Sequence, residues 1–270
     1  MQAFEAIVRA PDHDIDLALA ALLIARVECP ALAPEPWLGR LDDLAARARG
    51  DATADASSRL TRLRRVLFEE EGFRGNAGDY FDPRNSCLDQ VLERRLGIPI
   101  TLSVITMEIG RRAGLVIDGV GLPGHFVVSA RIGAAAILLD PFHGGTVLSA
   151  ADAEDVVAQA MGQHVALTPA HFAPVTKIQI LTRMLANLKS IYVKIEAWPK
   201  ALVVIDRLLL LEASGATQLR DRGTVLMKLG DFHAGAADWE RYLAKYPHAR
   251  DAEKLRTQLR RIRQVLASLN

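Results

Sequence analysis

The last third of the chain is a succession of helical segments joined by very short breaks, and this pattern leaves few folds open. Apolar residues recur at helical spacing between the breaks, and each break holds a proline or a glycine. Helices are therefore expected at residues 176–196, 199–212, 216–229, 232–245 and 249–268. Helices joined this tightly pack as antiparallel neighbours, so the segment 176–270 is expected to form an all-α array.

A loosely kept repeat runs through this array. Small residues at Gly223, Ala236 and Ala237 suit positions where two helices pack closely, and Pro247 ends the second copy. Over roughly residues 180–250 the pattern resembles the tetratricopeptide repeat family. Two copies are fewer than the three that such arrays usually need for stability. The array is therefore expected to depend on the domain before it.

The resemblance implies a protein or peptide partner for the array. A plain helical bundle that serves only as packing is the alternative. Exposed basic and aromatic side chains tend to anchor peptides, and the candidates of this kind are Arg220, Arg222, Lys228 and Tyr192.

The first two thirds of the chain mix helices with short strands. Helices are expected at residues 14–28, 35–49, 54–71, 85–96, 99–112 and 149–162. Short apolar runs separated by glycine and proline predict antiparallel strands at residues 116–117, 119–122, 125–130 and 136–139. The expected fold class is α+β, with a helical lead and a small sheet-containing core before the array.

Two polar residues are expected to meet on neighbouring strands of this core. His125 begins one predicted strand and Asp140 ends the next, so antiparallel pairing can bring them within hydrogen-bond reach. A carboxylate fixes the tautomer of a histidine and supports its protonated form, as in catalytic triads. Cys87 lies in the first turn of a preceding helix, where a thiolate is favoured. The sequence therefore offers a Cys87, His125 and Asp140 set.

The core resembles the transglutaminase-like, papain-related domain, and the whole chain is similar to the bacterial SirB-type family. The motifs that carry this resemblance are Gly72-Phe73, Tyr80, Asn85-Ser86, Gly97-Ile-Pro99, Leu102-Ser103, Gly119-Val-Gly-Leu-Pro-Gly-His125 and Asp140-Pro-Phe-His-Gly-Gly145. The resemblance implies a transglutaminase-like domain at residues 1–175 and tetratricopeptide-like repeats at residues 176–270. It also implies a regulatory or partner-binding role.

One departure from the family pattern concerns the nucleophile. In an active transglutaminase core a cysteine opens the helix that here begins at Pro99, and proline has no nucleophilic group. Thr101 and Ser103 follow within one turn, but both lie in an apolar run with no base beside them, which favours packing or bonding to the helix backbone. Cys87 comes one helix earlier, and filling a small apolar site is the competing interpretation for it.

The remaining site candidates are pocket residues of the same motifs, namely Asn85, Ser86, His143, Tyr80 and Ser103. His125, Asp140 and His143 can also supply two imidazoles and a carboxylate to a metal ion. No tight spacing motif supports that alternative, so no metal ligands and no cofactor are expected. A structural hydrogen bond between His125 and Asp140 is the other alternative.

The charge balance excludes a globally basic binding surface. The chain has 33 basic and 32 acidic residues, a net charge of +1, which gives no field favouring nucleic acid or an anionic membrane. The amino terminus lacks the features of a signal peptide, no apolar run is long enough to span a bilayer, and two cysteines form no disulfide framework.

We expect a cytoplasmic, non-catalytic protein-binding module. A cysteine-dependent acyltransferase or protease and a metal-dependent hydrolase are the alternatives.

Overall fold

The computed structural model describes residues 1–51, 53–211 and 215–268. These residues form two compact units, Gln2–Met184 and Leu185–Asn270. The boundary between the units lies inside helix α8 (Lys177–Lys194), whereas the sequence analysis placed a domain boundary between residues 175 and 176.

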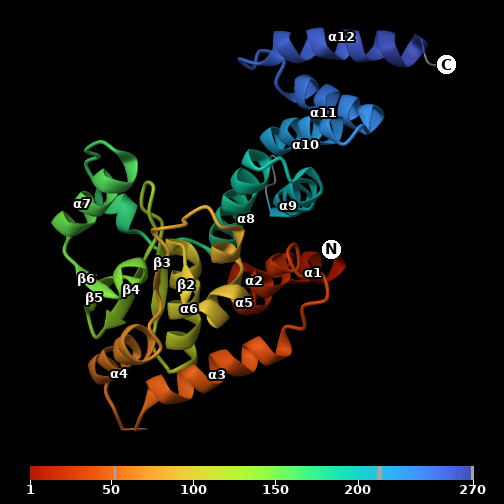
Figure 1. Ribbon diagram of the computed structural model, residues 1–270. Coiled ribbons are helices and arrows are strands. Elements are labelled where there is room, and N and C mark those ends of the chain that lie inside the picture. Colours follow the sequence, from red (N-terminus) through yellow and green to blue (C-terminus); the bar gives the residue numbers. More distant parts are fainter. Residues whose placement is uncertain (52, 212–214, 269–270) are drawn as a thin grey trace. The chain divides into compact units, whose positions relative to one another are not determined.

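The first unit contains seven α-helices, four 3₁₀ turns and a π-helical turn besides α8 (Figure 1). The α-helices are α1 (Gln2–Val8), α2 (Leu17–Ala25), α3 (Glu35–Arg49), α4 (Ala56–Arg64), α5 (Leu88–Arg94), α6 (Pro99–Arg112) and α7 (Ala150–Met161). The 3₁₀ turns are η1 (Asp12–Asp14), η3 (Pro83–Ser86), η4 (Pro141–His143) and η5 (Pro169–Phe172), and the π-helical turn η2 (Arg65–Glu70) continues α4.

Two small sheets accompany these helices. Strands β1 (Arg74–Gly75) and β2 (Leu96–Gly97) form a short parallel pair. The larger sheet is antiparallel in the order β3-β4-β5-β6, with strands β3 (Ile117–Val120), β4 (Val127–Ile132), β5 (Ala135–Asp140) and β6 (Thr146–Leu148). The α+β fold class is confirmed.

Helix α2 shows how composition determines burial in the helical lead. Its segment is leucine- and alanine-rich, and nearly all of its side chains are buried. The Asp16 carboxylate caps the helix by accepting a hydrogen bond from the amide of Leu19. A helix that is apolar all round must lie inside the fold, and α2 contacts both α5 and α6.

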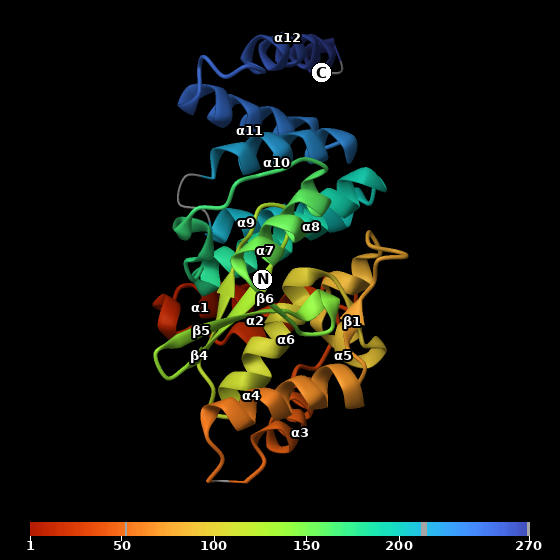
Figure 2. The ribbon, with the colours of Figure 1, turned by 90° about the vertical axis from the view of Figure 1, so that its left-hand side faces the viewer.

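Helix α6 is the centre of the first unit. It begins with Pro99 in the first turn, where the missing N–H is tolerated, and it contacts α3, α5, β3 and β4. At Gly110 a Cβ atom would lie 2.3 Å from Cδ1 of Ile117, so the absence of a side chain lets the helix approach β3 closely. Figure 2 shows α6 among the helices of the lead and beside the strands.

The antiparallel register brings the site residues together. Val120 pairs with Val127 and Val128 pairs with Leu139, so the turn before β4 lies next to the end of β5. Helix α7 packs against this region through Ala153 and Val157. His125, just before β4, and Asp140, at the end of β5, therefore lie next to each other, as the sequence predicted.

The second unit continues α8 with α9 (Trp198–Leu211), α10 (Ala216–Lys228), α11 (Phe232–Lys245) and α12 (Ala252–Ser268). At Gly223 an added Cβ would lie 2.5 Å from the ring of Trp239, so α10 and α11 pack as closely as a glycine allows. Arg222 forms ion pairs with Asp238 at 2.6 Å and Asp206 at 3.1 Å. The hydrogen bond with Asp238 raises the pKa of the Arg222 guanidinium.

The predicted peptide anchors of the array have different environments. Tyr192 is fully buried, so it cannot present its ring to a partner. Arg222 is held by its two carboxylates, and Arg220 by Asp221 and Asp251. Lys228 lies with its Nζ 5.6 Å from the centroid of the Trp198 ring. The expectation that Tyr192 is an exposed anchor is therefore wrong, because this ring lies on the face of α8 that packs inward.

Candidate functional site

His125 lies in the tight turn that leads from β3 into β4. Its amide donates to the carbonyl of Leu122 at 3.2 Å, and Gly124 adopts a left-handed conformation with φ of 69°. Because L-residues with a Cβ rarely take that conformation, glycine is suited to this position. The turn leaves the His125 side chain almost wholly buried, with 5% exposure.

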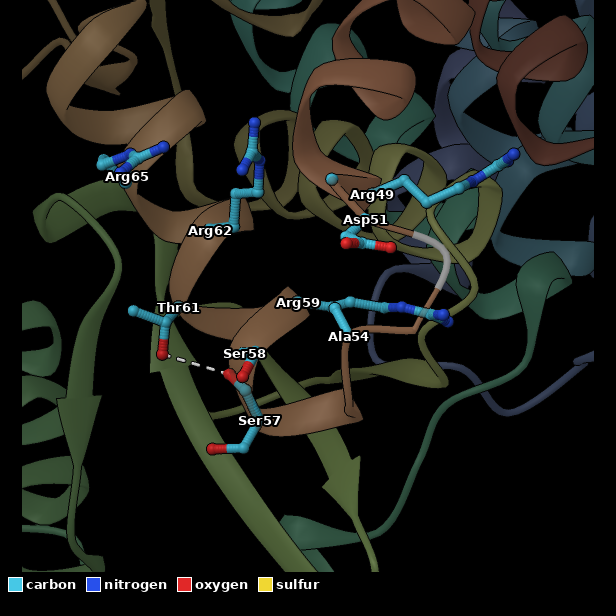
Figure 3. A pocket seen from close by; sticks show the side chains of 10 residues that line it. Arg49, Asp51, Ala54, Ser57, Ser58, Arg59, Thr61, Arg62 and Arg65 are labelled. Carbon is cyan, nitrogen blue, oxygen red and sulfur yellow. Dashed lines mark hydrogen bonds between the residues drawn. The ribbon is translucent and has the colours of Figure 1, made fainter.

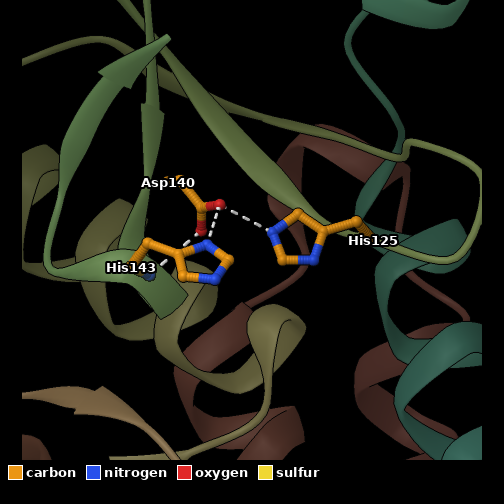
Figure 4. Close-up of side chains that lie close together, drawn as sticks. All are labelled: His125, Asp140 and His143. Atoms are coloured by element: carbon orange, nitrogen blue, oxygen red, sulfur yellow. Dashed lines mark hydrogen bonds and ion pairs between the residues drawn. The ribbon is translucent and has the colours of Figure 1, made fainter. Parts of the chain in front are cut away.

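Asp140 ends β5 and caps the 3₁₀ turn η4. Its Oδ1 accepts hydrogen bonds from the amides of Phe142 at 2.9 Å and His143 at 3.3 Å. Its Oδ2 lies 2.8 Å from Nε2 of His125 and 2.7 Å from Nδ1 of His143 (Figure 4). One carboxylate thus orients two imidazoles, and the two rings stack at 5.7 Å between centroids.

The environment keeps Asp140 in its ionised form. Burial raises the pKa of the carboxyl, but hydrogen bonds and charge interactions with His125 and His143 lower it, and the net pKa lies below the usual range. Asp140 is itself fully buried. Its ion-pair partners among the described residues are the two histidines.

A cavity of about 540 Å³ opens beside the two histidines. Its chemically informative lining residues are Tyr80, Pro99, His125, Phe142 and His143. Aromatic rings form much of the wall: Phe142 lies edge-on to His125, with centroids 6.0 Å apart, and to Tyr80 at 6.2 Å. Burial raises the pKa of the Tyr80 hydroxyl, so it remains a neutral hydrogen-bonding group at neutral pH. The cavity suits a side chain or small group with one polar end.

Pro99 and Cys87 differ in their relation to this cavity. Pro99, the first residue of α6, lines it together with His125. Cys87 is the N-cap of α5, is fully buried, and has its Sγ 3.5 Å from the carbonyl oxygen of Pro83. The described residues that line the cavity do not include Cys87.

Asn85 connects two walls of the cavity. Its Nδ2 donates to the carbonyls of Asp79 at 2.7 Å and Tyr80 at 3.3 Å, and its Oδ1 accepts from Asn76 at 3.1 Å. Its own carbonyl accepts from the amide of Ile98 at 3.3 Å, next to the start of α6. Asn85 therefore holds the Tyr80 loop in a fixed relation to Pro99, although it is buried behind both.

Ser86 and Ser103 lie in the same buried region. Ser103 donates to the carbonyl of Phe126 at 3.4 Å, which ties α6 to the strand after His125. The Ser86 hydroxyl is buried and makes no hydrogen bond within the part of the chain that the structure describes. Neither residue is among the described residues that line the cavity, although both were predicted as pocket residues.

Arg183 is a site residue that the sequence reasoning missed. Its guanidinium donates to the carbonyls of Leu122 at 3.2 Å and His125 at 2.7 Å, and it lies 5.3 Å from the ring centroid of Phe126. Burial lowers the pKa of this guanidinium. The side chain holds the turn that carries His125. The one signal in the sequence is a basic residue interrupting the apolar face of α8 beside Met184.

A second pocket, of about 410 Å³, is lined by arginines and hydroxyl groups and is shown in Figure 3. Two of its arginines satisfy carbonyls at helix ends. Arg62 donates to the carbonyl of Arg47 at 2.7 Å, at the end of α3, and Arg49 donates to the carbonyl of Arg112, at the end of α6. Cations are stabilising at helix carboxyl ends, so this cluster is explained by helix capping.

Comparison with known families identifies a transglutaminase-like domain followed by tetratricopeptide repeats. The model of the transglutaminase-like superfamily matches residues 35–186, and a tetratricopeptide repeat model matches residues 188–260. The domain pairing expected from the resemblance to SirB-type proteins is therefore confirmed. The chain belongs to the UPF0162 family.

The UPF0162 relatives align with about three quarters or more of this chain. A UPF0162 protein of Xylella fastidiosa (strain 9a5c) is 36% identical over 254 residues, which is 92% of this chain and 90% of that protein. A UPF0162 protein of Vibrio cholerae is 31% identical over 206 residues, 76% of each chain. The human F-box only protein 21 is 34% identical over 140 residues, 49% of this chain and 21% of that protein. Among the described residues, no helix is both long and apolar enough to cross a membrane.

Proposed function

We propose that this protein is a non-catalytic binding module, in which the transglutaminase-like cavity takes a side chain or terminus of a protein partner. The observation that supports this most directly is that Pro99, the first residue of α6, lines the cavity beside His125. By the resemblance to transglutaminase cores, the start of this helix is where an active enzyme has its cysteine. A proline offers neither a nucleophile nor an N–H donor. The histidine and Asp140 remain as a fixed polar end of the cavity.

The cavity has the composition of a recognition pocket. Binding sites for small groups are mostly apolar, with a few fixed polar atoms that set orientation. Here Tyr80 and Phe142 provide the apolar walls, and Nδ1 of His125 and Nε2 of His143 have no hydrogen-bond partner among the described residues. These ring nitrogens can donate to or accept from a bound group.

The tetratricopeptide array supplies a second candidate contact. A pocket of about 420 Å³ lies between α8, α9 and α10, with the apolar residues Val193, Trp198 and Val225 flanked by Lys189 and Lys194. Lys189 already pairs with Asp221 of the same lining at 2.9 Å, so the apolar and aromatic surface is the feature that suits a peptide with apolar anchors.

Selection of displayed random peptides on the purified full chain tests this function. A selected peptide should bind Phe142→Ala at least tenfold more weakly by fluorescence polarisation, because an aromatic side chain that a bound peptide covers contributes more than about 1.4 kcal/mol. Phe81→Ala, which changes a 56% exposed ring outside the cavity lining, is the matched control. Equal affinity for the two variants contradicts the cavity as the binding site. A parallel Trp198→Ala variant reports on the array pocket.

The enzyme alternative requires Cys87 to act with His125 and Asp140. Burial of the thiol predicts that iodoacetamide labels Cys87 far more slowly than Cys29, which is exposed and serves as an internal reference. If Cys87 is labelled at least as fast as Cys29, and the labelling rate of Cys87 decreases in His125→Ala, the non-catalytic role is contradicted.

A gain-of-thiol variant tests the position of Pro99 independently. In Pro99→Cys the new thiol opens α6 and faces the same cavity as His125. We expect it to be labelled rapidly, and the rate to fall when His125 is replaced as well. If Pro99→Cys is labelled slowly, and replacement of His125 does not change the labelling rate, the assignment of Pro99 to the nucleophile position is wrong. We also propose that the protein acts in the reducing cytoplasm, since both cysteines are free thiols.

A further inference from the structure

The buried carboxylate of Asp140 lacks a strong cationic partner. It is fully buried, yet the ion pairs that it makes within the described residues are with two histidines, which carry charge only when protonated. A buried charge is costly unless it is paired or bound to a metal. No lysine or arginine in the described residues pairs with it. The cluster is therefore suited electrostatically to a bound cation.

The donor set fits a borderline transition metal. Two imidazole nitrogens and one carboxylate oxygen make up three-ligand sites of Zn²⁺ and of related divalent ions, which leave further positions open. The carboxylate is already oriented for this role. Its Oδ1 is held by the amides of Phe142 and His143, which leaves Oδ2 for His125 and His143, or for an ion between them. Outer hydrogen bonds of this kind commonly fix metal ligands.

The distances require only a small adjustment. The three donor atoms lie within 4.8 Å of one another, and Oδ2 is 2.8 and 2.7 Å from the two nitrogens. Zinc ligands at about 2.1 Å from the ion are about 3.4 Å apart at tetrahedral angles. Each of the two Oδ2–nitrogen distances must therefore lengthen by about 0.6–0.7 Å to admit an ion.

His143 is placed to make that movement. Its side chain is 48% exposed, and it ends the short 3₁₀ turn η4 just before Gly144 and Gly145, which both have positive φ. His125 is buried and held by Arg183, and Asp140 is held by two amides. One half-exposed ligand beside two fixed ligands allows an ion to enter from the cavity side.

We propose that His125, Asp140 and His143 bind a divalent transition metal ion, with Zn²⁺ as the best match, and that its open coordination position faces the cavity. Coordination through Nε2 leaves the proton of His125 on Nδ1, which has no hydrogen-bond partner among the described residues. A bound carboxylate or carbonyl group can contact both the ion and this N–H. The inference does not depend on a binding role for the array.

Metal content and metal titration test the proposal. Untagged full-length protein purified without chelator should carry close to one Zn²⁺ per chain by inductively coupled plasma mass spectrometry, and the same measurement reports iron if that ion is preferred. Metal-stripped protein should bind added Zn²⁺ in calorimetry and give the visible absorption of low-symmetry Co²⁺ on titration with cobalt.

The variants separate this site from surface histidines. His143→Ala and Asp140→Asn should each weaken Zn²⁺ binding at least tenfold, whereas His233→Ala, which changes an exposed histidine of α11, should not. His143 is half exposed, so its variant is expected to fold, and far-UV circular dichroism checks this. Metal content near zero together with equal Zn²⁺ affinity in the His143 and His233 variants overturns the proposal. Loss of peptide binding with intact Zn²⁺ binding contradicts only the binding function.

Discussion

Replacing Arg183 tests how the turn before β4 is held in place. Arg183→Ala removes a charged donor from the carbonyls of Leu122 and His125 and a ring contact with Phe126. A hydrogen bond to a charged group contributes about 1.5–3 kcal/mol, and a partly buried cation–π contact about 1 kcal/mol. Part of this loss is offset, because the variant no longer has to bury a charged guanidinium and because water can enter and bond the freed carbonyls. The net cost expected is about 3 kcal/mol.

For a unit of this size each kcal/mol lowers the melting temperature by about 2–4 °C, so Arg183→Ala should lower it by about 6–12 °C in differential scanning calorimetry. The melting temperature of Arg183→Lys should fall between those of the unmodified protein and Arg183→Ala, because an ammonium group cannot span both carbonyls. Hydrogen exchange of the His125 amide, which is bonded to Leu122, should become faster. The control is Arg131→Ala, a 64% exposed arginine that lies 3.7 Å from Asp118 and whose ion pair contributes at most about 1 kcal/mol. If the Arg183 variant is destabilised no more than this control, the assigned role of the guanidinium is wrong.

Three further substitutions probe separate parts of the fold. Gly75→Ala places a Cβ 2.5 Å from the ring of Phe142, so it should lower the free energy of unfolding by about 1–3 kcal/mol and displace a wall of the cavity. The first effect is measured as a lower unfolding midpoint in denaturant, and the second as weaker peptide binding. Gly223→Ala places a Cβ 2.5 Å from the ring of Trp239 and should separate α10 from α11, seen as a change in tryptophan fluorescence and a lower melting temperature. Asp152 belongs to the capping box of α7, and hydrogen bonds with the cap residue lower its pKa. Its stabilisation is present above the unfolded pKa of about 3.9 and lost as pH falls through the lower folded pKa, so the melting-temperature deficit of Asp152→Ala at neutral pH should vanish in acid.

Each glycine prediction has a matched control. Gly78→Ala changes a residue of the same loop region with nothing within 4 Å of the new Cβ, and it should leave stability and binding unchanged. Gly39→Ala lies in the interior of α3, also with open space, and should stabilise by about 0.5–1 kcal/mol through helix propensity. A glycine variant that behaves like its control contradicts the close contact assigned to it. A deficit for Asp152→Ala that persists below the folded pKa contradicts the charge-dependent cap.

Local signals predicted most elements of this fold. Helix α6 was expected at residues 99–112 and is Pro99–Arg112, because a first-turn proline and a following glycine define its ends. The meeting of His125 and Asp140 was predicted because antiparallel neighbours bring the start of one strand to the end of the next. The helices of the array were predicted from apolar spacing together with the proline or glycine in each break.

Features that depend on tertiary packing were not predicted. Strand β6 is three residues long and pairs only with β5, and its sequence carries no alternation long enough to identify it. The second imidazole on Asp140 depends on the exact path of the 3₁₀ turn η4, which returns His143 toward β5. Arg183 lies 58 residues from the carbonyl of His125 that it binds, so no local pattern reports the contact. Burial of Tyr192 follows from which face of α8 packs inward.

The course of α8 also limits how the protein can be divided or recombined. A truncation after residue 175, where the sequence suggests a natural break, removes the guanidinium that holds the His125 turn, so loss of binding in that fragment says nothing about the repeats. The family match that ends at residue 186 retains Arg183. In chimaeras between relatives, a crossover after residue 186 keeps Arg183 with the carbonyls of Leu122 and His125 that it binds, whereas a crossover at residue 175 exchanges one without the other. The transglutaminase-like domain therefore includes the first turns of α8.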